Sequence, residues 1–166
     1  GSDIDSVGMC SLARIRNLRR LYLRRTKVGD SGFSIFGSLA DLEVLCLSDT
    51  SVGDVASGEI RKCARLRRLE LDRTRVTDAG AVLLAGLPLV ALRLDGTSVG
   101  DGCLGGIVGI KTLKRFDLSG TKVTARGLET LATLQGLERL KLFETGVTQA
   151  EAQSLRRILS NCEISP

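Results

Sequence analysis

Leucines and polar residues alternate along this chain in one pattern, L-x-x-L-x-L-x-x-T-x-V, that returns six times. Neighbouring copies start 24 residues apart four times and 23 residues apart once. The copies open at Leu18, Leu42, Leu66, Leu89, Leu113 and Leu137. A fixed period in this range predicts a solenoid, because one such unit cannot bury its apolar face alone and must stack on its neighbours.

Within each copy the central leucines alternate with polar residues, which is the period of a short strand with one buried face. Leu69 and Leu71 should therefore point into the core. One strand per repeat predicts a parallel sheet with strands ~4.8 Å apart. Parallel strands need a crossover connection, and the second half of each repeat has apolar residues at helical spacing, such as Leu128, Leu131 and Leu134.

Threonines stand where three of these helices should begin. Thr77, Thr124 and Thr148 occupy expected N-cap positions, and Thr148 with Glu151 has the spacing of a capping box. The crossover at 100–109 is rich in glycine, which weakens a helix by ~1 kcal/mol per residue relative to alanine. We expect this crossover to be the least helical and the most mobile.

The pattern and its period resemble the leucine-rich repeat family, in a variant that has Thr where the family usually has Asn. The resemblance implies an α/β fold: a right-handed horseshoe segment with a parallel β-sheet on the concave face and helices on the convex face. We expect a single domain over residues 1–166. It would consist of a partial repeat at 3–17, six repeats from residue 18, and a C-terminal helix and strand stub at 149–166.

The threonine of the pattern recurs once per repeat and forms a polar column. A hydroxyl group is both a donor and an acceptor, so these side chains can satisfy backbone groups where the chain leaves the strand. We interpret the column as a structural ladder between adjacent turns, because no general base accompanies any threonine. Its members are Thr26, Thr50, Thr74, Thr97, Thr121 and Thr145.

The two ends of the chain differ in their predicted structure. Aligning the N-terminus with the second copy places a helix at 5–14 and leaves the strand at Leu21 with an open edge. Open edges recruit other strands, so we expect either a longer parent protein or self-association through this edge. At the other end, Ile158 and Leu159 should face inward from a final helix, and Ile164 should add a seventh strand.

Composition argues against several classes of protein. The chain has no histidine, which removes the commonest general base and the commonest zinc ligand. We therefore expect no catalytic residues, no metal and no cofactor. The five cysteines are scattered without a C-x-x-C pair, which favours a reduced, intracellular protein over a disulfide framework. No apolar run approaches the ~18 residues that a membrane helix needs.

The strand residues that point away from the core form the candidate binding surface, because packing does not dictate them. They mix arginine and aromatic residues with carboxylates, a composition typical of protein interfaces. Together with the resemblance, this favours a non-enzymatic scaffold that binds a protein on its concave face. The candidate residues are Arg20, Tyr22, Arg24, Cys46, Arg68, Glu70, Asp72, Arg93, Asp95, Arg115, Asp117, Arg139, Lys141 and Phe143.

The net charge of +5 bears on the partner. Positive residues crowd the first and third copies, so we expect a protein partner with acidic patches. A polyanion, either nucleic acid or anionic lipid head groups, is the second candidate for this basic rim. For any one charged residue, a solvated position with charges paired along and across the strands is the alternative.

Overall fold

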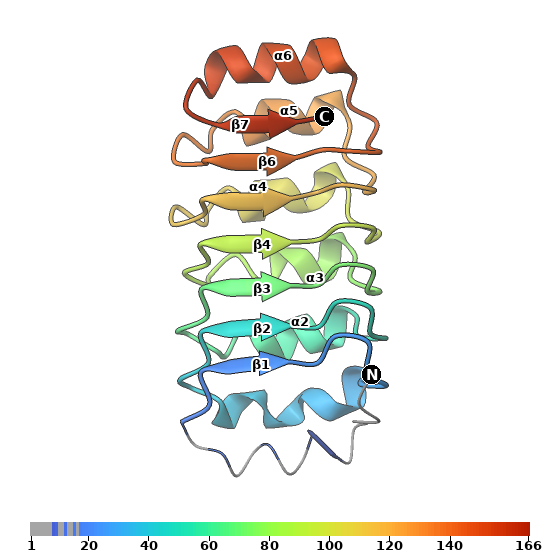
Figure 1. The fold of residues 1–166 in the computed structure, drawn as a ribbon, viewed down its shortest axis with the longest axis vertical. Coiled ribbons are helices and arrows are strands. Elements are labelled where there is room, and N and C mark those ends of the chain that lie inside the picture. The colour runs from blue at the N-terminus through green and yellow to red at the C-terminus, as the bar shows by residue number, and fades with distance from the viewer. Residues whose placement is uncertain (1–7, 10–11, 13–14, 16) are drawn as a thin grey trace.

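The computed structural model describes residues 8–9, 12, 15 and 17–166, with the backbone alone at 35–38. Seven strands form one parallel sheet in chain order (Figure 1). They are β1 (Arg20–Tyr22), β2 (Val44–Cys46), β3 (Arg68–Glu70), β4 (Ala91–Arg93), β5 (Arg115–Asp117), β6 (Arg139–Lys141) and β7 (Glu163–Ser165). The predicted parallel sheet is confirmed, and Ile164 lies in the seventh strand as expected.

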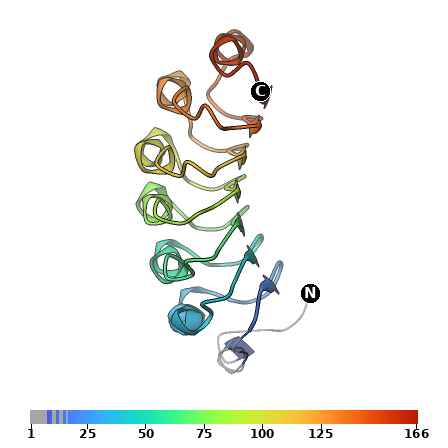
Figure 2. The same cartoon turned by 90° about the vertical axis from the view of Figure 1, so that its left-hand side faces the viewer.

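A helical segment carries the chain from each strand to the next. Figure 2 shows the strands along the inner curve and the helices along the outer curve, which confirms the predicted layers. Two segments are 3₁₀-helices, η1 (Asp30–Ser38) and η2 (Asp101–Cys103). The α-helices are α2 (Asp54–Ile60), α3 (Asp78–Val82), α4 (Leu104–Ile107), α5 (Ala125–Leu131) and α6 (Gln149–Ile158).

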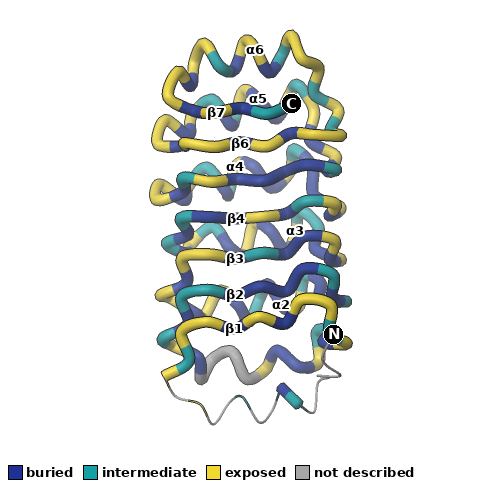
Figure 3. Tube along the Cα trace, viewed as in Figure 1, coloured by how far each residue is buried: buried dark blue, intermediate teal, exposed yellow. Residues whose placement is uncertain are grey.

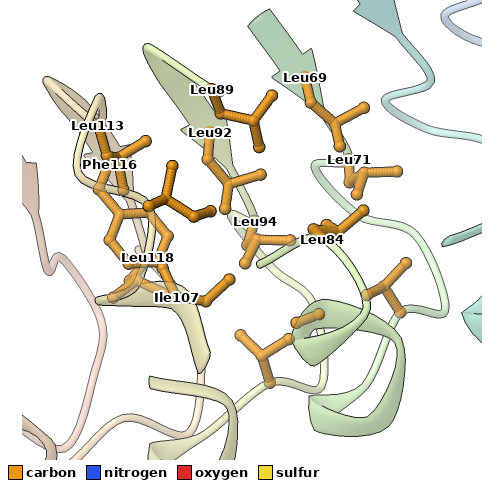
Figure 4. Packing of buried hydrophobic residues seen from close by; sticks show 14 of the residues in the cluster. Leu69, Leu71, Leu84, Leu89, Leu92, Leu94, Ile107, Leu113, Phe116 and Leu118 are labelled. Carbon is orange, nitrogen blue, oxygen red and sulfur yellow. The ribbon is translucent and has the colours of Figure 1, made fainter. Parts of the chain in front are cut away.

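The inward leucines form one continuous column between the two layers (Figure 4). Leu69, Leu71, Leu92 and Leu94 have no exposed surface. Phe116 takes the place of a leucine in the fifth copy and is 2% exposed. Buried residues recur at corresponding places in successive turns (Figure 3). Full burial of one such side chain stabilises the fold by ~1.5–3 kcal/mol, so the column is the main source of stability.

The prediction for the two ends holds only in part. Ile158 is the last residue of α6 and is 55% exposed, so its predicted inward position is wrong. The chain leaves the helical conformation at Leu159, where ψ is 65°, and this change of direction buries Leu159 while Ile158 faces outward. Most of the helix expected at 5–14 lies outside the described residues; within it, Gly8, Met9 and Leu12 are helical.

The threonine column is structural but does not bridge adjacent turns. Each hydroxyl donates to the backbone carbonyl three residues earlier in its own repeat, as Thr74 Oγ1 does to Leu71 O at 2.7 Å. The same bond, of 2.6–2.7 Å, forms at Thr26, Thr50, Thr97, Thr121 and Thr145. A hydroxyl close to its own backbone satisfies a local acceptor more readily than one a strand away. Backbone bonds, such as Arg73 N to Asp95 O at 2.7 Å, join the turns there.

A column of aspartates, which the sequence analysis did not single out, connects one turn to the next. Asp54 Oδ1 accepts from Thr77 N at 2.8 Å and its Oδ2 accepts from Thr77 Oγ1 at 2.7 Å. Asp101 binds Thr124 in the same way, at 2.9 and 2.6 Å. Each aspartate starts a helix, where a negative charge is favourable. The two other members of the column bind the backbone N–H that precedes the next helix: Asp30 binds Gly53 and Asp78 binds Gly100.

The aspartate column ends where its residue type changes. Ala125 occupies the next aspartate position and has no carboxylate to offer to Thr148. Thr148 instead receives its acceptor from its own helix, because Glu151 Oε2 accepts from both Thr148 N and Thr148 Oγ1 at 2.7 Å. The predicted capping box is thus confirmed. The capping box replaces the aspartate bond between repeats with hydrogen bonds inside the last repeat.

The predicted N-caps are confirmed, whereas the prediction that the glycine-rich crossover is the least helical is wrong. Thr77 and Thr124 each accept a backbone N–H from the first turn of the following helix. The crossover at 100–109 is helical from Asp101 to Ile107, through the 3₁₀ turn η2 and then α4, and so exceeds the five-residue α3. That this crossover is the most mobile one stays a prediction. The sequence did not predict that η1 would be a 3₁₀-helix throughout.

Replacing Asp54 with alanine tests the aspartate column. Asp54→Ala leaves Thr77 N without its acceptor, and we expect the free energy of unfolding to fall by ~1–3 kcal/mol in denaturant titration. Asp41→Ala is the control, since the one polar side-chain contact of Asp41 within the described residues is an exposed ion pair with Arg65, at 2.5 Å, and its loss should cost less than ~1 kcal/mol. Equal losses in the two variants would contradict a structural role for the column.

The leucine column gives a second prediction. Leu71→Ala removes a fully buried side chain from a middle turn and should lower the free energy of unfolding by ~2–5 kcal/mol. Ile164→Ala, in the last strand, should cost less, because stability in a repeat array comes from contacts with the repeats on both sides. Melting temperatures of the two variants check this, and an equal decrease in both would argue against it.

Candidate functional site on the concave sheet

The concave surface is made of the outward positions of the strands and of the residues just after them. Tyr22 is 61% exposed and Phe143 is 46% exposed, so both aromatic residues point outward as predicted. Glu70 and Asp95 are half-buried. The other predicted residues that are exposed are all basic: Arg20, Arg24, Arg68, Arg93, Arg115, Arg139 and Lys141.

Three of the predicted surface residues are buried, which corrects the expectation that they face solvent. Cys46, Asp72 and Asp117 are 4%, 3% and 8% exposed. A basic side chain of the next strand pairs with each of the two aspartates. Arg93, for example, reaches Asp72 with an Nη2 to Oδ2 distance of 2.9 Å. The side chains of these three residues therefore lie beneath the concave surface and are not accessible to a partner.

Buried Asp72 is the centre of a small polar network. Its Oδ2 accepts from Ser48 Oγ at 3.1 Å and its Oδ1 accepts from Arg93 Nε at 3.3 Å. Burial raises the pKa of the Asp72 carboxyl, and the charge of Arg93 opposes that rise. The network fixes the direction of Arg93 on the concave face, because a buried carboxylate needs both partners.

Cys46 does not have the surroundings of a nucleophile. Burial raises the pKa of its thiol above the ordinary value, and nearby Glu70 raises it further. A thiol with a raised pKa is protonated at neutral pH and unreactive. The other cysteines in the described part of the chain are also buried, and burial raises the pKa of Cys63 and of Cys162 to about 11 and that of Cys103 to about 12.

The first outward position of each strand forms a row across the sheet that we call the arginine row. The strand register aligns Arg20, Val44, Arg68, Ala91, Arg115 and Arg139 in that order. In the described part of the chain, the side chains of Arg20, Arg68 and Arg115 form no hydrogen bond or ion pair. Arg139 pairs with Glu163, with 3.2 Å between Nε and Oε2. Three guanidinium groups of this row are therefore available to a ligand.

Two hollows lie along the arginine row, over its two small residues. One, of about 280 Å³, has Ala91 between Arg68 and Arg115 in its lining, which also includes Arg139 and Lys141. The other, of about 370 Å³, extends the row toward β1 and adds three lining residues of that end, Arg20, Tyr22 and Val44. A guanidinium group binds a carboxylate with two parallel hydrogen bonds, so these hollows suit acidic groups.

An ion-pair cluster lies beside this row, where the strands end. Asp49 Oδ1 accepts from Arg73 Nε at 2.6 Å, and Asp49 Oδ2 accepts from Arg24 Nε at 3.0 Å. Arg73 Nη1 also donates to Asp95 Oδ2 at 3.0 Å. Hydrogen bonds from Arg73 hold the pKa of the Asp49 carboxyl well below its usual range. Of the predicted residues, Arg24 is thus bonded to Asp49 and Asp95 is bonded to Arg73, so both are less available to a partner.

Asp49 and Arg73 were not among the predicted site residues, although the sequence contains a signal for their ion pair. They stand immediately before Thr50 and Thr74, one repeat apart, so a positive and a negative residue share one column. Both have a left-handed backbone, with φ of 60° and 50°. That conformation is uncommon outside glycine, asparagine and aspartate, and at this position two other repeats carry Gly96 and Gly120 instead.

The described residues bring together no group of three or more histidine, cysteine, aspartate or glutamate side chains that could hold a metal ion. Within the same residues, no helix has the length and apolar character that crossing a lipid bilayer requires. The arrangement on the concave face offers charge, hydrogen-bond donors and exposed aromatic rings. Arginine and aromatic side chains of this kind are enriched at protein interfaces.

Comparison with known proteins agrees with the fold. Residues 109–132 match a family model described as Leucine Rich repeat. No curated protein matches the sequence. Among solved structures, a leucine-rich repeat protein of Leptospira interrogans superimposes with a TM-score of 0.70 and 21% identity over 93% of this chain and 38% of that one. An internalin of Listeria monocytogenes gives 0.65 and 16%, over 93% of this chain and 49% of that one.

A third similar structure is the leucine-rich repeat ectodomain of the plant membrane receptor kinase GASSHO1/SCHENGEN3 from Arabidopsis thaliana, in complex with CASPARIAN STRIP INTEGRITY FACTOR 2. Its TM-score is 0.69 and its identity 16%, over 96% of this chain and 19% of that one. This chain therefore spans less than half the length of each of the three structures. The predicted resemblance is confirmed at the level of the fold.

The pKa of Asp49 gives a prediction for stability against pH. A carboxyl whose folded pKa is lowered stabilises the fold above its unfolded pKa of ~4 and loses that contribution as the pH falls toward the folded value. Asp49→Asn should therefore unfold more easily than the wild type at pH 7, and this difference should shrink below pH ~4. Denaturant titrations at several pH values measure it, with exposed Glu129→Gln as the control. A difference that stays constant down to pH ~2 would contradict the prediction.

Proposed function

We propose that this leucine-rich repeat protein is a non-enzymatic scaffold that binds another protein through its concave sheet. Leucine-rich repeat domains generally serve as protein-interaction scaffolds, which supports the general class. The solved receptor ectodomain with a bound partner belongs to the same class of fold. The buried cysteine thiols of the described chain favour an intracellular setting for this scaffold.

The observation that carries the proposal is the arginine row. Arg20, Arg68 and Arg115 are exposed on the concave face, and no carboxylate of the described chain neutralises them. Most other cations near this face, such as Arg73 and Arg93, are held by aspartates. Arginine is enriched among the residues that dominate binding energy at interfaces. An acidic patch on the partner would supply the missing counter-charge.

A polyanion is the second candidate, and the carboxylates on the same face argue against it. Glu70 and Asp95 lie among the arginines, and Glu163 already pairs with Arg139. A phosphate backbone is best tracked by an unbroken basic stripe. Salt dependence separates the two partners, since binding to a polyanion weakens steeply and linearly in a plot of log K against log salt concentration.

The double variant Arg68→Ala/Arg115→Ala tests the scaffold proposal. Affinity capture from a lysate of the source organism should recover a protein with the wild type and lose it with this variant, because two unpaired guanidinium groups are removed. The matched control is Arg61→Ala/Arg157→Ala, which removes the same charge from exposed positions on the helical face. Loss of the captured protein with the control alone, or with both variants equally, would contradict a concave binding face.

A further inference from the structure

The three unpaired arginines of the arginine row recur at regular intervals. Arg20, Arg68 and Arg115 lie on β1, β3 and β5, always two strands apart and in strict register. Adjacent strands are ~4.8 Å apart, so two strand spacings separate successive arginines by about 9.6 Å at the backbone. The sheet curves toward this face (Figure 2), which brings the side-chain ends slightly closer together than that.

The residues between these arginines leave the row open. Val44 and Ala91 stand on the intervening strands β2 and β4, and both line the hollows described above. Their short side chains place no obstacle between one guanidinium group and the next. A ligand that follows the row therefore runs across the strands, along the axis of the solenoid, and meets a positive charge at every second strand.

Only some chain conformations repeat at this distance. A polyproline II helix has three residues per turn and rises ~3.1 Å per residue, so every third side chain points the same way at intervals of about 9.3 Å. A β-strand repeats its side chains at about 6.6 Å. An α-helix returns to the same face after two turns, about 10.8 Å, and would fall out of step by more than 2 Å over the three arginines.

We propose that the arginine row binds an acidic polyproline II segment of the partner, with a carboxylate at every third residue opposite Arg20, Arg68 and Arg115. This inference rests on the proposed scaffold function and names the chemistry of its ligand. Each carboxylate accepts two hydrogen bonds from one guanidinium group. Exposed Tyr22 stands beside Arg20 on β1, where its ring contacts a proline of the segment, as aromatic side chains do in other polyproline-binding grooves.

Two synthetic peptides of identical composition test the spacing. The first is Glu-Pro-Pro repeated four times, and the second has its four glutamates in one block with four prolines on each side. Both have the same charge, so a difference in affinity reports the spacing alone. In fluorescence anisotropy at ~0.15 M salt, we expect the spaced peptide to bind about tenfold more tightly than the block peptide.

Single variants assign the binding to the row. Arg68→Ala and Arg115→Ala should each weaken the spaced peptide about tenfold, since each removes one charge-assisted bidentate contact. Arg61→Ala, on the helical face, should leave it unchanged. Because the side chains of Arg68 and Arg115 bond to nothing in the described structure, the melting temperature of both variants should equal that of the wild type, which separates loss of binding from loss of folding.

Each alternative outcome overturns a defined part of the proposal. Equal affinity for the two peptides, or tighter binding of a twelve-nucleotide oligothymidylate, shows that charge and not spacing is recognised. In another outcome, the spaced peptide fails to bind although the double variant Arg68→Ala/Arg115→Ala loses the protein that the wild type captures. That result rejects the polyproline ligand and leaves the scaffold function intact. If the double variant also keeps the captured protein, both proposals fail.

Discussion

The fold depends on burying leucines between neighbouring turns, which no single turn achieves alone. Each strand is only three residues long, so it has few hydrogen bonds and one inward side chain at its centre. Leu69 is fully buried because the equivalent leucines of the turns before and after it stack on both sides. This requirement fixes the register of the sheet, and the register in turn aligns every outward column, including the arginine row.

The sequence predicted those features that repeat with the leucines, and the structure confirms them. The order of the strands, the helical outer layer and the outward position of Tyr22 follow from the period and the alternation alone. The burial of Asp72 did not follow, because it depends on Arg93 of the next strand folding over it. A pattern of polar and apolar residues predicts which face of the sheet a side chain lies on. It does not predict whether neighbouring side chains bury it there.

Polar contacts between turns were also hard to predict from the sequence. Thr74 was expected to bridge turns, but its own carbonyl at Leu71 is closer. The bridging role falls to aspartates such as Asp54. The glycine two residues after the aspartate of the next repeat has a physical reason, because a Cβ at Gly80 would overlap the Asp54 carboxylate. In the sequence, an aspartate at a helix start is already accounted for by its favourable interaction with the helix dipole. The sequence therefore offers no reason to expect a second partner in the next repeat.

The end of the aspartate column at Ala125 has a consequence for how such a protein changes over generations. The helices α2, α3, η2 and α5 each begin on a bond donated to an aspartate of the preceding turn, whereas α6 begins on the Thr148–Glu151 bonds within its own turn. A gene duplication or recombination between α5 and α6 would break no carboxylate bond at the helix start. At that junction the start of the later helix depends on no carboxylate of the earlier turn.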